Sequence, residues 1–304
     1  MSRGLQWCPF LLVVLVLCGG PGCSAPEQSS LTPEDQLPAD HAAAWRAWYE
    51  QDPSWSEWRP RVAEDPTLAN FFVDNLWRVM VRHYDHAAIT RAGELPGPFE
   101  RARRELLFLR DQSGPVCVEL LVTGDGVVSF LAGDLLLRMD EGRWTLPVAR
   151  QLENDRAEGR RRAAEWLGRL PFAGDDEAEV CERLARAAAA DPEWFVRAQA
   201  VTSTGERALA SGRLGSARPV LIRALADGDP AVARAACEAL GAGGDPRSVP
   251  ALINLLERME RGQLSDLRTL EAVRAALGRL TGARDPVSVA EWRSWWLENR
   301  PERP

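Results

Sequence analysis

The stretch that decides the fold is DPAVARAACEALGAGGDPRSVPALINLL, residues 229–256. Asp-Pro occurs twice in it, at 229–230 and again at 245–246. An Asp side chain can accept hydrogen bonds from the free amides of a first helical turn, and Pro is well tolerated at the first helical position. The stretch therefore predicts two consecutive helices, each introduced by Asp-Pro and separated by a glycine-rich turn.

The same pattern recurs along the chain with a period of 36–37 residues, marked by Gly168, Gly205, Gly241 and Gly278. Residues one, five and nine positions before each glycine would share one helical face. These columns hold Leu167, Thr204, Leu240 and Leu277; Ala163, Ala200, Ala236 and Val273; and Gly159, Val196, Val232 and Thr269. Small residues in the middle column would let a neighbouring helix come close. Each marker glycine is predicted to end its helix in the left-handed conformation.

A second helix is predicted before each of these. The segments 216–227 and 247–258 share Pro-x-Leu-Ile, with Pro219 and Pro250 expected in the first turn. Pro115 and Pro147 would mark earlier copies. Further Asp-Pro helix starts are expected at 52–53, 65–66, 191–192 and 285–286.

These motifs resemble HEAT repeats of the short bacterial type that also occurs in phycobilisome lyases. Residues 229–256 match that pattern most closely, DPEWFVRAQA (191–200) matches its Asp…Val-Arg…Ala part, and RRAAEWLGRL (161–170) its Ala-Ala…Leu-Gly part. The sequence departs from the pattern at Ala233, where Arg is usual, at Ser203-Thr204, and in a long loop at 205–216. The resemblance covers 145–281 well and 98–144 weakly. It implies an all-α, right-handed solenoid of antiparallel helix pairs.

Outside the clear repeats, residues 65–89 have the apolar spacing of an amphipathic helix. Residues 41–64 are expected to form two short helices. Residues 98–144 could form β-hairpins around Gly-Asp-Gly, but we favour helices. Trp292, Trp295 and Trp296 would share one face of a C-terminal helix. The predicted domains are a signal peptide (1–22), a flexible tether (23–40), a helical N-terminal cap (41–97), the solenoid (98–281) and a Trp-rich capping helix (282–304).

The N-terminal segment predicts export. Arg3 is followed by an apolar run at 10–17, which is too short to span a bilayer and has the length of a signal-peptide core. Gly22-Cys23 resembles a bacterial lipoprotein signal, which implies that Cys23 is lipidated and holds the protein on the membrane of the cell envelope. Cleavage after Ala25 with plain secretion, or a retained anchor, are the alternatives.

The amino-acid composition excludes some classes of catalytic mechanism and argues against some classes of partner. All 37 cationic side chains are Arg, which excludes any mechanism that needs a lysine amine. The net charge of −7 argues against a nucleic-acid partner. Cys117, Cys181 and Cys237 form no zinc or disulfide pattern and are expected to be small buried apolar residues. His83 and His86 have no evident third metal ligand. No metal and no cofactor are predicted.

We therefore expect a monomeric, non-enzymatic scaffold that binds a protein partner in the concave groove of the solenoid. The candidate contact residues are Arg160, Arg161, Trp194, Arg197, Trp292 and Trp295. The competing interpretation makes the arginines part of a solvated face with Glu partners, and the tryptophans part of the core at the solenoid ends. The alternative function is a lyase-like or chaperone-like role in handling a cofactor. The predicted export signal argues against a role in attaching a pigment, because pigment attachment takes place in the cytoplasm.

Lipidation of Cys23 can be tested directly. Cys23→Ser should move the protein from the membrane fraction to the soluble fraction, because the acyl chains would be lost. The measurement is fractionation with immunoblotting, together with metabolic labelling by radioactive palmitate. A wild-type protein that takes up no label would contradict this prediction.

Overall fold

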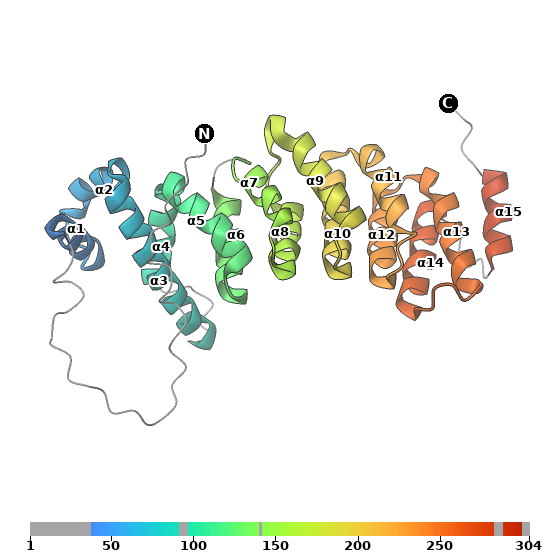
Figure 1. Cartoon of the computed structure of the whole chain (residues 1–304), viewed down its shortest axis with the longest axis horizontal. Helices are drawn as coiled ribbons and strands as arrows, with labels where there is room; N and C mark the ends of the chain where they lie inside the picture. Colours follow the sequence, from blue (N-terminus) through green and yellow to red (C-terminus); the bar gives the residue numbers. More distant parts are fainter. Residues whose placement is uncertain (1–37, 91–96, 140–141, 283–287, 300–304) are drawn as a thin grey trace, which may run out of the picture. The chain divides into compact units, whose positions relative to one another are not determined.

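The computed structural model of the chain describes residues 38–90, 97–139, 142–282 and 288–299, and of residues 85–90 the backbone alone. These residues form helices and connecting turns, with no strand among them (Figure 1). The α-helices are α1 (Ala39–Tyr49), α2 (Trp55–Glu64), α3 (Pro66–Thr90), α4 (Gly97–Phe108), α5 (Arg110–Thr123), α6 (Gly126–Arg138), α7 (Thr145–Arg150), α8 (Ala157–Arg169), α9 (Glu177–Ala190), α10 (Trp194–Ser211), α11 (Leu214–Ala224), α12 (Pro230–Gly243), α13 (Val249–Glu260), α14 (Leu267–Thr281) and α15 (Val289–Asn299). The predicted all-α repeat fold is confirmed.

The chain divides into two compact units, residues 1–52 and 53–304. Of the first unit the structure describes residues 38–52, which include α1, and there the ring centroids of Trp45 and Trp48 lie 4.9 Å apart. The second unit begins with α2, α3 and α4. There Arg59 donates from Nε to Glu105 at 2.8 Å and stacks over the Phe108 ring at 3.8 Å, which ties α2 to α4. Residues 97–138 form α4, α5 and α6, so the hairpin alternative for this region is wrong.

Helices α8, α10, α12 and α14 pack against one another in sequence, and α9, α11 and α13 pack against this row (Figure 1). The residues of the predicted columns lie on the helix faces that contact the neighbouring helices of the row. The members of the middle and leucine columns are fully buried except Thr204, which is half-buried. Ser203 donates to the Ala164 carbonyl of α8 at 2.7 Å, so the Ser-Thr departure from the repeat pattern supplies a hydrogen bond between helices.

The marker glycines do not end their helices, and that prediction is wrong. Gly205 and Gly241 lie inside α10 and α12, and the left-handed residues that follow these helices are Gly212 and Gly244. The marker glycines instead allow close packing. A Cβ at Gly205 would lie 2.6 Å from Ala239 Cβ, and one at Gly241 would lie 2.9 Å from Ala276 Cα.

The helix starts are partly as predicted. Asp65, Asp229 and Asp245 each accept a backbone amide two residues ahead, at 2.8–3.1 Å. At 191–192, α10 instead begins at Trp194. The Asp-Pro at 285–286 lies outside the described residues. Pro115 and Pro219 lie within α5 and α11, past the first turn, so their predicted role as first-turn residues is wrong.

The close approach at Gly205 gives a prediction in which packing opposes helix propensity. Alanine stabilises an exposed helix position by about 1 kcal/mol over glycine. Gly205→Ala should nevertheless lower the free energy of unfolding by about 1–3 kcal/mol, because α10 and α12 would have to separate. The control is Gly215→Ala in α11, where an added Cβ meets no atom within 4 Å. Urea denaturation should show a loss of stability for Gly205→Ala only. Equal changes in the free energy of unfolding for the two variants would contradict the packing role of Gly205.

Candidate functional site

The candidate site is a hollow of about 280 Å³ on the surface formed by α8, α10 and α12, which we call the Trp194 hollow. Trp194 is 47% exposed and meets Phe195 edge-on, with ring centroids 5.8 Å apart. Arg161 contributes from α8 and Arg234 from α12. The lining residues are Arg161, Trp194, Phe195, Ala198, Gln199, Thr202, Ala231, Arg234, Ala235 and Glu238. The lining combines three alanines with an exposed tryptophan, two arginines and the exposed Glu238.

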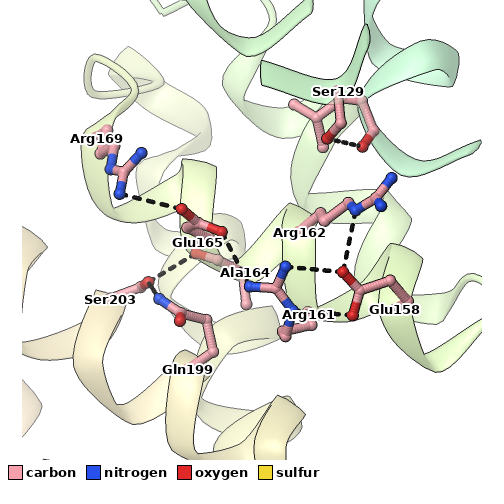
Figure 2. A network of polar contacts seen from close by, with 10 residues as sticks. Ser129, Glu158, Arg161, Arg162, Ala164, Glu165, Arg169, Gln199 and Ser203 are labelled. Atoms are coloured by element: carbon pink, nitrogen blue, oxygen red, sulfur yellow. Dashed lines mark hydrogen bonds and ion pairs between the residues drawn. The ribbon is translucent and has the colours of Figure 1, made fainter. Parts of the chain in front are cut away.

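Arg161 is held in place by carboxylates of its own helix (Figure 2). It donates to Glu158 at 2.8 and 2.9 Å and to Glu165 at 3.0 Å. Glu158 also accepts from Arg162, and Glu165 pairs with Arg169 at 3.0 Å. Hydrogen bonds from Arg161 hold the pKa of Glu158 below its usual value, and those same bonds raise the pKa of Arg161. The guanidinium therefore stays charged and fixed while remaining partly open to solvent.

Arg234 is bound more loosely. Its closest carboxylate is Asp266, at 3.9 Å, and Asp266 already accepts the Thr269 amide and hydroxyl as the N-cap of α14. The guanidinium of Arg234 is therefore the more available of the two cations at this hollow.

Arg160 and Arg197, two other predicted contact residues, do not line the Trp194 hollow. Arg197 donates to both Asp227 carboxylate oxygens, at 2.8 and 2.9 Å, and to the Asp191 and Pro192 carbonyls. Arg160 repeats this arrangement one period earlier, with Asp191 at 2.7 and 3.0 Å. Each arginine thus links the turn before its own helix to the turn of the next repeat. We call these two contacts the Arg–Asp ladder.

The ladder stops where the sequence departs from the repeat pattern. Ala233 takes the position of Arg160 and Arg197, and Leu264 takes that of Asp191 and Asp227. Both Ala233 and Leu264 are buried. The ion pair present in two repeats is thus replaced, at the equivalent positions of the third repeat, by two buried apolar residues.

The predicted contact residues of the C-terminal helix lie outside the hollow. Trp292 is only 2% exposed and lies on α15, which packs against α13. Trp295 and Trp296 are half-buried. A role of these residues in partner binding stays a prediction.

Sequence reasoning missed a larger cavity, of about 650 Å³, between α9, α10 and α11. We call it the Cys181 pocket, because the Cys181 side chain lies on its wall. Cys117 and Cys237 are buried as predicted, but Cys181 is exposed, so the prediction for it is wrong. In α9 the apolar stripe falls on Val180 and Leu184, which turns Cys181 away from the core.

An ion pair lies beside this pocket. Arg207 is 3% exposed and donates to both Glu177 carboxylate oxygens, at 2.9 and 2.5 Å. Its remaining terminal nitrogen donates to the Leu167 and Leu170 carbonyls. Burial alone would raise the pKa of Glu177, but hydrogen bonds from Arg207 and the Ala173 amide hold it below its usual value. The pair joins α10 to the start of α9 and to the end of α8.

The described residues hold no group of three His, Cys, Asp or Glu side chains arranged for a metal ion. Within the same residues, no helix has the length and apolar character needed to cross a bilayer. Cys23 and the predicted signal peptide lie outside the described part of the chain.

A match to a known family of sequences supports the repeat assignment. The sequence profile of the HEAT repeats matches residues 206–264. No curated protein matches the chain. Among solved structures, a crystal structure of an engineered protein is similar at 16% identity and a TM-score of 0.38, covering 69% of this chain and 96% of that one. The complex of CpcE and CpcF of phycocyanin lyase from Nostoc sp. PCC7120 is similar at 17% identity and a TM-score of 0.31, covering 86% and 99%.

The Glu177–Arg207 pair leads to a stability prediction. Glu177→Ala should lower the free energy of unfolding by about 3–5 kcal/mol, because it leaves a buried guanidinium without its carboxylate. Replacing both partners, with Glu177→Leu and Arg207→Met, should recover most of that loss. Because folding lowers the pKa of Glu177, its contribution is present at neutral pH and is lost as the pH falls below about 4.3, the usual Glu value.

Urea denaturation at pH 7 and pH 3.5 measures both effects. The wild type should lose more stability between the two pH values than the double variant does. Equal losses would contradict the assigned pKa shift, and a double variant as unstable as Glu177→Ala would contradict the ion-pair account.

Proposed function

We propose that the protein is a non-enzymatic helical-repeat scaffold that binds a protein partner at the Trp194 hollow. The observation that carries this proposal is the exposed indole of Trp194 between Arg161 and Arg234, on a surface built from three consecutive repeat helices. Trp and Arg are enriched among the residues that dominate binding energy in protein interfaces. A large exposed aromatic side chain beside a shallow hollow fits an anchor for a partner side chain.

The surroundings of Trp194 support this assignment. Trp194 begins α10, and Arg197 binds the carbonyls of the turn just before it, so the Arg–Asp ladder anchors the backbone from which Trp194 extends. Arg161 is likewise fixed by Glu158 and Glu165. Side chains that are ordered before binding lose less conformational entropy in the complex. An anchored backbone at Trp194 and an ordered Arg161 therefore favour a specific protein contact at this hollow.

The partner should present an apolar side chain flanked by a carboxylate. Arg234 is the cation that such a carboxylate would meet, because its nearest acidic partner is 3.9 Å away and serves mainly as a helix cap. A bidentate Arg–carboxylate contact would add orientation as well as affinity.

We further propose that lipidation of Cys23 holds this scaffold at the membrane of the cell envelope. The support is the sequence alone: the apolar run at 10–17, Gly22-Cys23, and the Pro- and Ser-rich residues that follow. A tether of that composition would let the repeat unit move near the membrane while its partner is bound.

Site-specific photo-crosslinking tests the partner site. A benzophenone amino acid is placed at position 194, and as a control at Phe130 of α6, an exposed aromatic residue outside the hollow. Irradiated membrane fractions are analysed by mass spectrometry. We expect one protein adduct from position 194 that position 130 does not give. No adduct, or the same adducts from both positions, would contradict the proposal.

Once the partner is purified, Trp194→Ala and Arg234→Ala should each weaken its binding at least tenfold, about 1.4 kcal/mol, with melting temperatures close to that of the wild type. Leu267→Ala, at another exposed apolar residue of the repeats, is the matched control and should leave the affinity unchanged. Isothermal titration calorimetry gives the affinities.

A further inference from the structure

The Cys181 pocket is a second site, separate from the Trp194 hollow. Its volume of about 650 Å³ lies in the range of small-molecule binding pockets, which is about 300–1,000 Å³. Helices α9, α10 and α11 form its walls. The two cavities share no lining residue.

The repeat that forms this pocket differs from the next one beside the pocket wall. In the following repeat Leu214 of α11 packs directly over Gly243 of α12, where no Cβ would fit. At the corresponding places, α10 has Arg207 and α9 has Glu177. An ion pair between α9 and α10 thus takes the place of an apolar contact between α11 and α12.

Most of the wall is apolar, formed by Phe172, Leu184, Ala185, Ala208, Ala217 and Val220. The polar groups on the wall are already engaged. Thr204 and Ser216 donate to backbone carbonyls, at 2.7 and 2.8 Å. Glu177 is paired with Arg207, and Glu182 with Arg186 at 3.1 Å. None of these groups needs a polar partner from a ligand.

Arg213 is the exception. It lies at the pocket beside the start of α11, is exposed, and forms no side-chain hydrogen bond or ion pair among the described residues. It lines the same pocket as Cys181, and its charge acts to lower the pKa of that thiol, against burial and the Glu177 carboxylate, which raise it. Each carboxylate of the wall has an arginine partner, so Arg213 supplies a cation without a counterion. An apolar cavity with one such cation is complementary to an apolar molecule with one negative charge.

We propose that the Cys181 pocket binds a free fatty acid, with the aliphatic chain along α9 and α11 and the carboxylate on Arg213. A guanidinium binds a carboxylate through charge-assisted hydrogen bonds, while the methylene groups gain from leaving water. This site adds a small-molecule ligand to the proposed scaffold and does not depend on the partner at the Trp194 hollow.

Cys181 provides a reporter on the pocket wall of the unmodified full-length chain. Burial and the nearby Glu177 carboxylate raise the pKa of this thiol, so alkylation by N-ethylmaleimide is followed at pH 8.5. Mass spectrometry of the peptide that carries Cys181 gives the rate at this residue alone. A ligand in the pocket should slow that rate at least fivefold.

The test measures binding of octanoate, decanoate and dodecanoate by isothermal titration calorimetry and by protection of Cys181. Affinity should rise by about fourfold for each added methylene group. Arg213→Gln should weaken dodecanoate binding about tenfold or more and leave dodecanol binding unchanged. Val220→Trp should block both ligands by filling the cavity. Arg223→Gln, at an exposed arginine of α11 that does not line the pocket, is the matched control and should change neither.

Three results would overturn the proposal. The first is a Cys181 alkylation rate that dodecanoate does not change. The second is equal affinity of the wild type and Arg213→Gln for dodecanoate, which would remove the carboxylate contact. The third is protection by phosphatidylglycerol vesicles as strong as that by dodecanoate, which would identify a membrane lipid as the occupant. Trp194→Ala should bind dodecanoate like the wild type, so failure at one site can be told from failure at the other.

Discussion

Close contact between neighbouring helices at Gly205 and Gly241 is the constraint on which the repeat unit depends. At these points the backbone of one helix meets Ala239 or Ala276 of the next, with no room for a Cβ. Such an approach brings the leucine and alanine columns of the same helices into contact, and these side chains are buried along the row α8, α10, α12 and α14. The period of 36–37 residues in the sequence reflects this contact, because every repeat needs a small residue at the equivalent position of its helix.

The repeat period, the helices and most buried columns could be predicted from the sequence, because they follow from spacing along one chain. The role of the marker glycines could not. A glycine that ends a helix and a glycine that admits a neighbouring helix look alike when followed by a short polar segment. Only the partner helix distinguishes them, and Ala239 lies 34 residues beyond Gly205. The prediction that Cys181 is buried fails for a related reason. Val180, one position earlier in α9, is buried, whereas Cys181 is exposed.

At the candidate site, the different roles of two adjacent arginines could not be predicted from the sequence either. Arg160 and Arg161 have equal sequence signals, yet Arg160 joins the Arg–Asp ladder and Arg161 reaches the Trp194 hollow. The difference depends on an aspartate 31 residues away, at Asp191, which local spacing does not reveal. One sequence signal could have found the ladder: Arg160 with Asp191 and Arg197 with Asp227 recur with the repeat, and both members change together at Ala233 and Leu264. A polar pair that is replaced as a pair is a sign of contact.

Helix α10 connects the two cavities, because residues between Trp194 and Thr202 line the Trp194 hollow and residues between Thr204 and Ser211 line the Cys181 pocket. Both halves of this helix are tied to neighbouring segments, by Arg197 to the turn before it and to Asp227, and by Arg207 to Glu177 and the end of α8. Coupling between two sites requires an element with two arrangements that both ligands bias. A helix fixed in both halves by bidentate ion pairs has one arrangement available at low cost. We therefore infer that the two proposed sites act independently of each other.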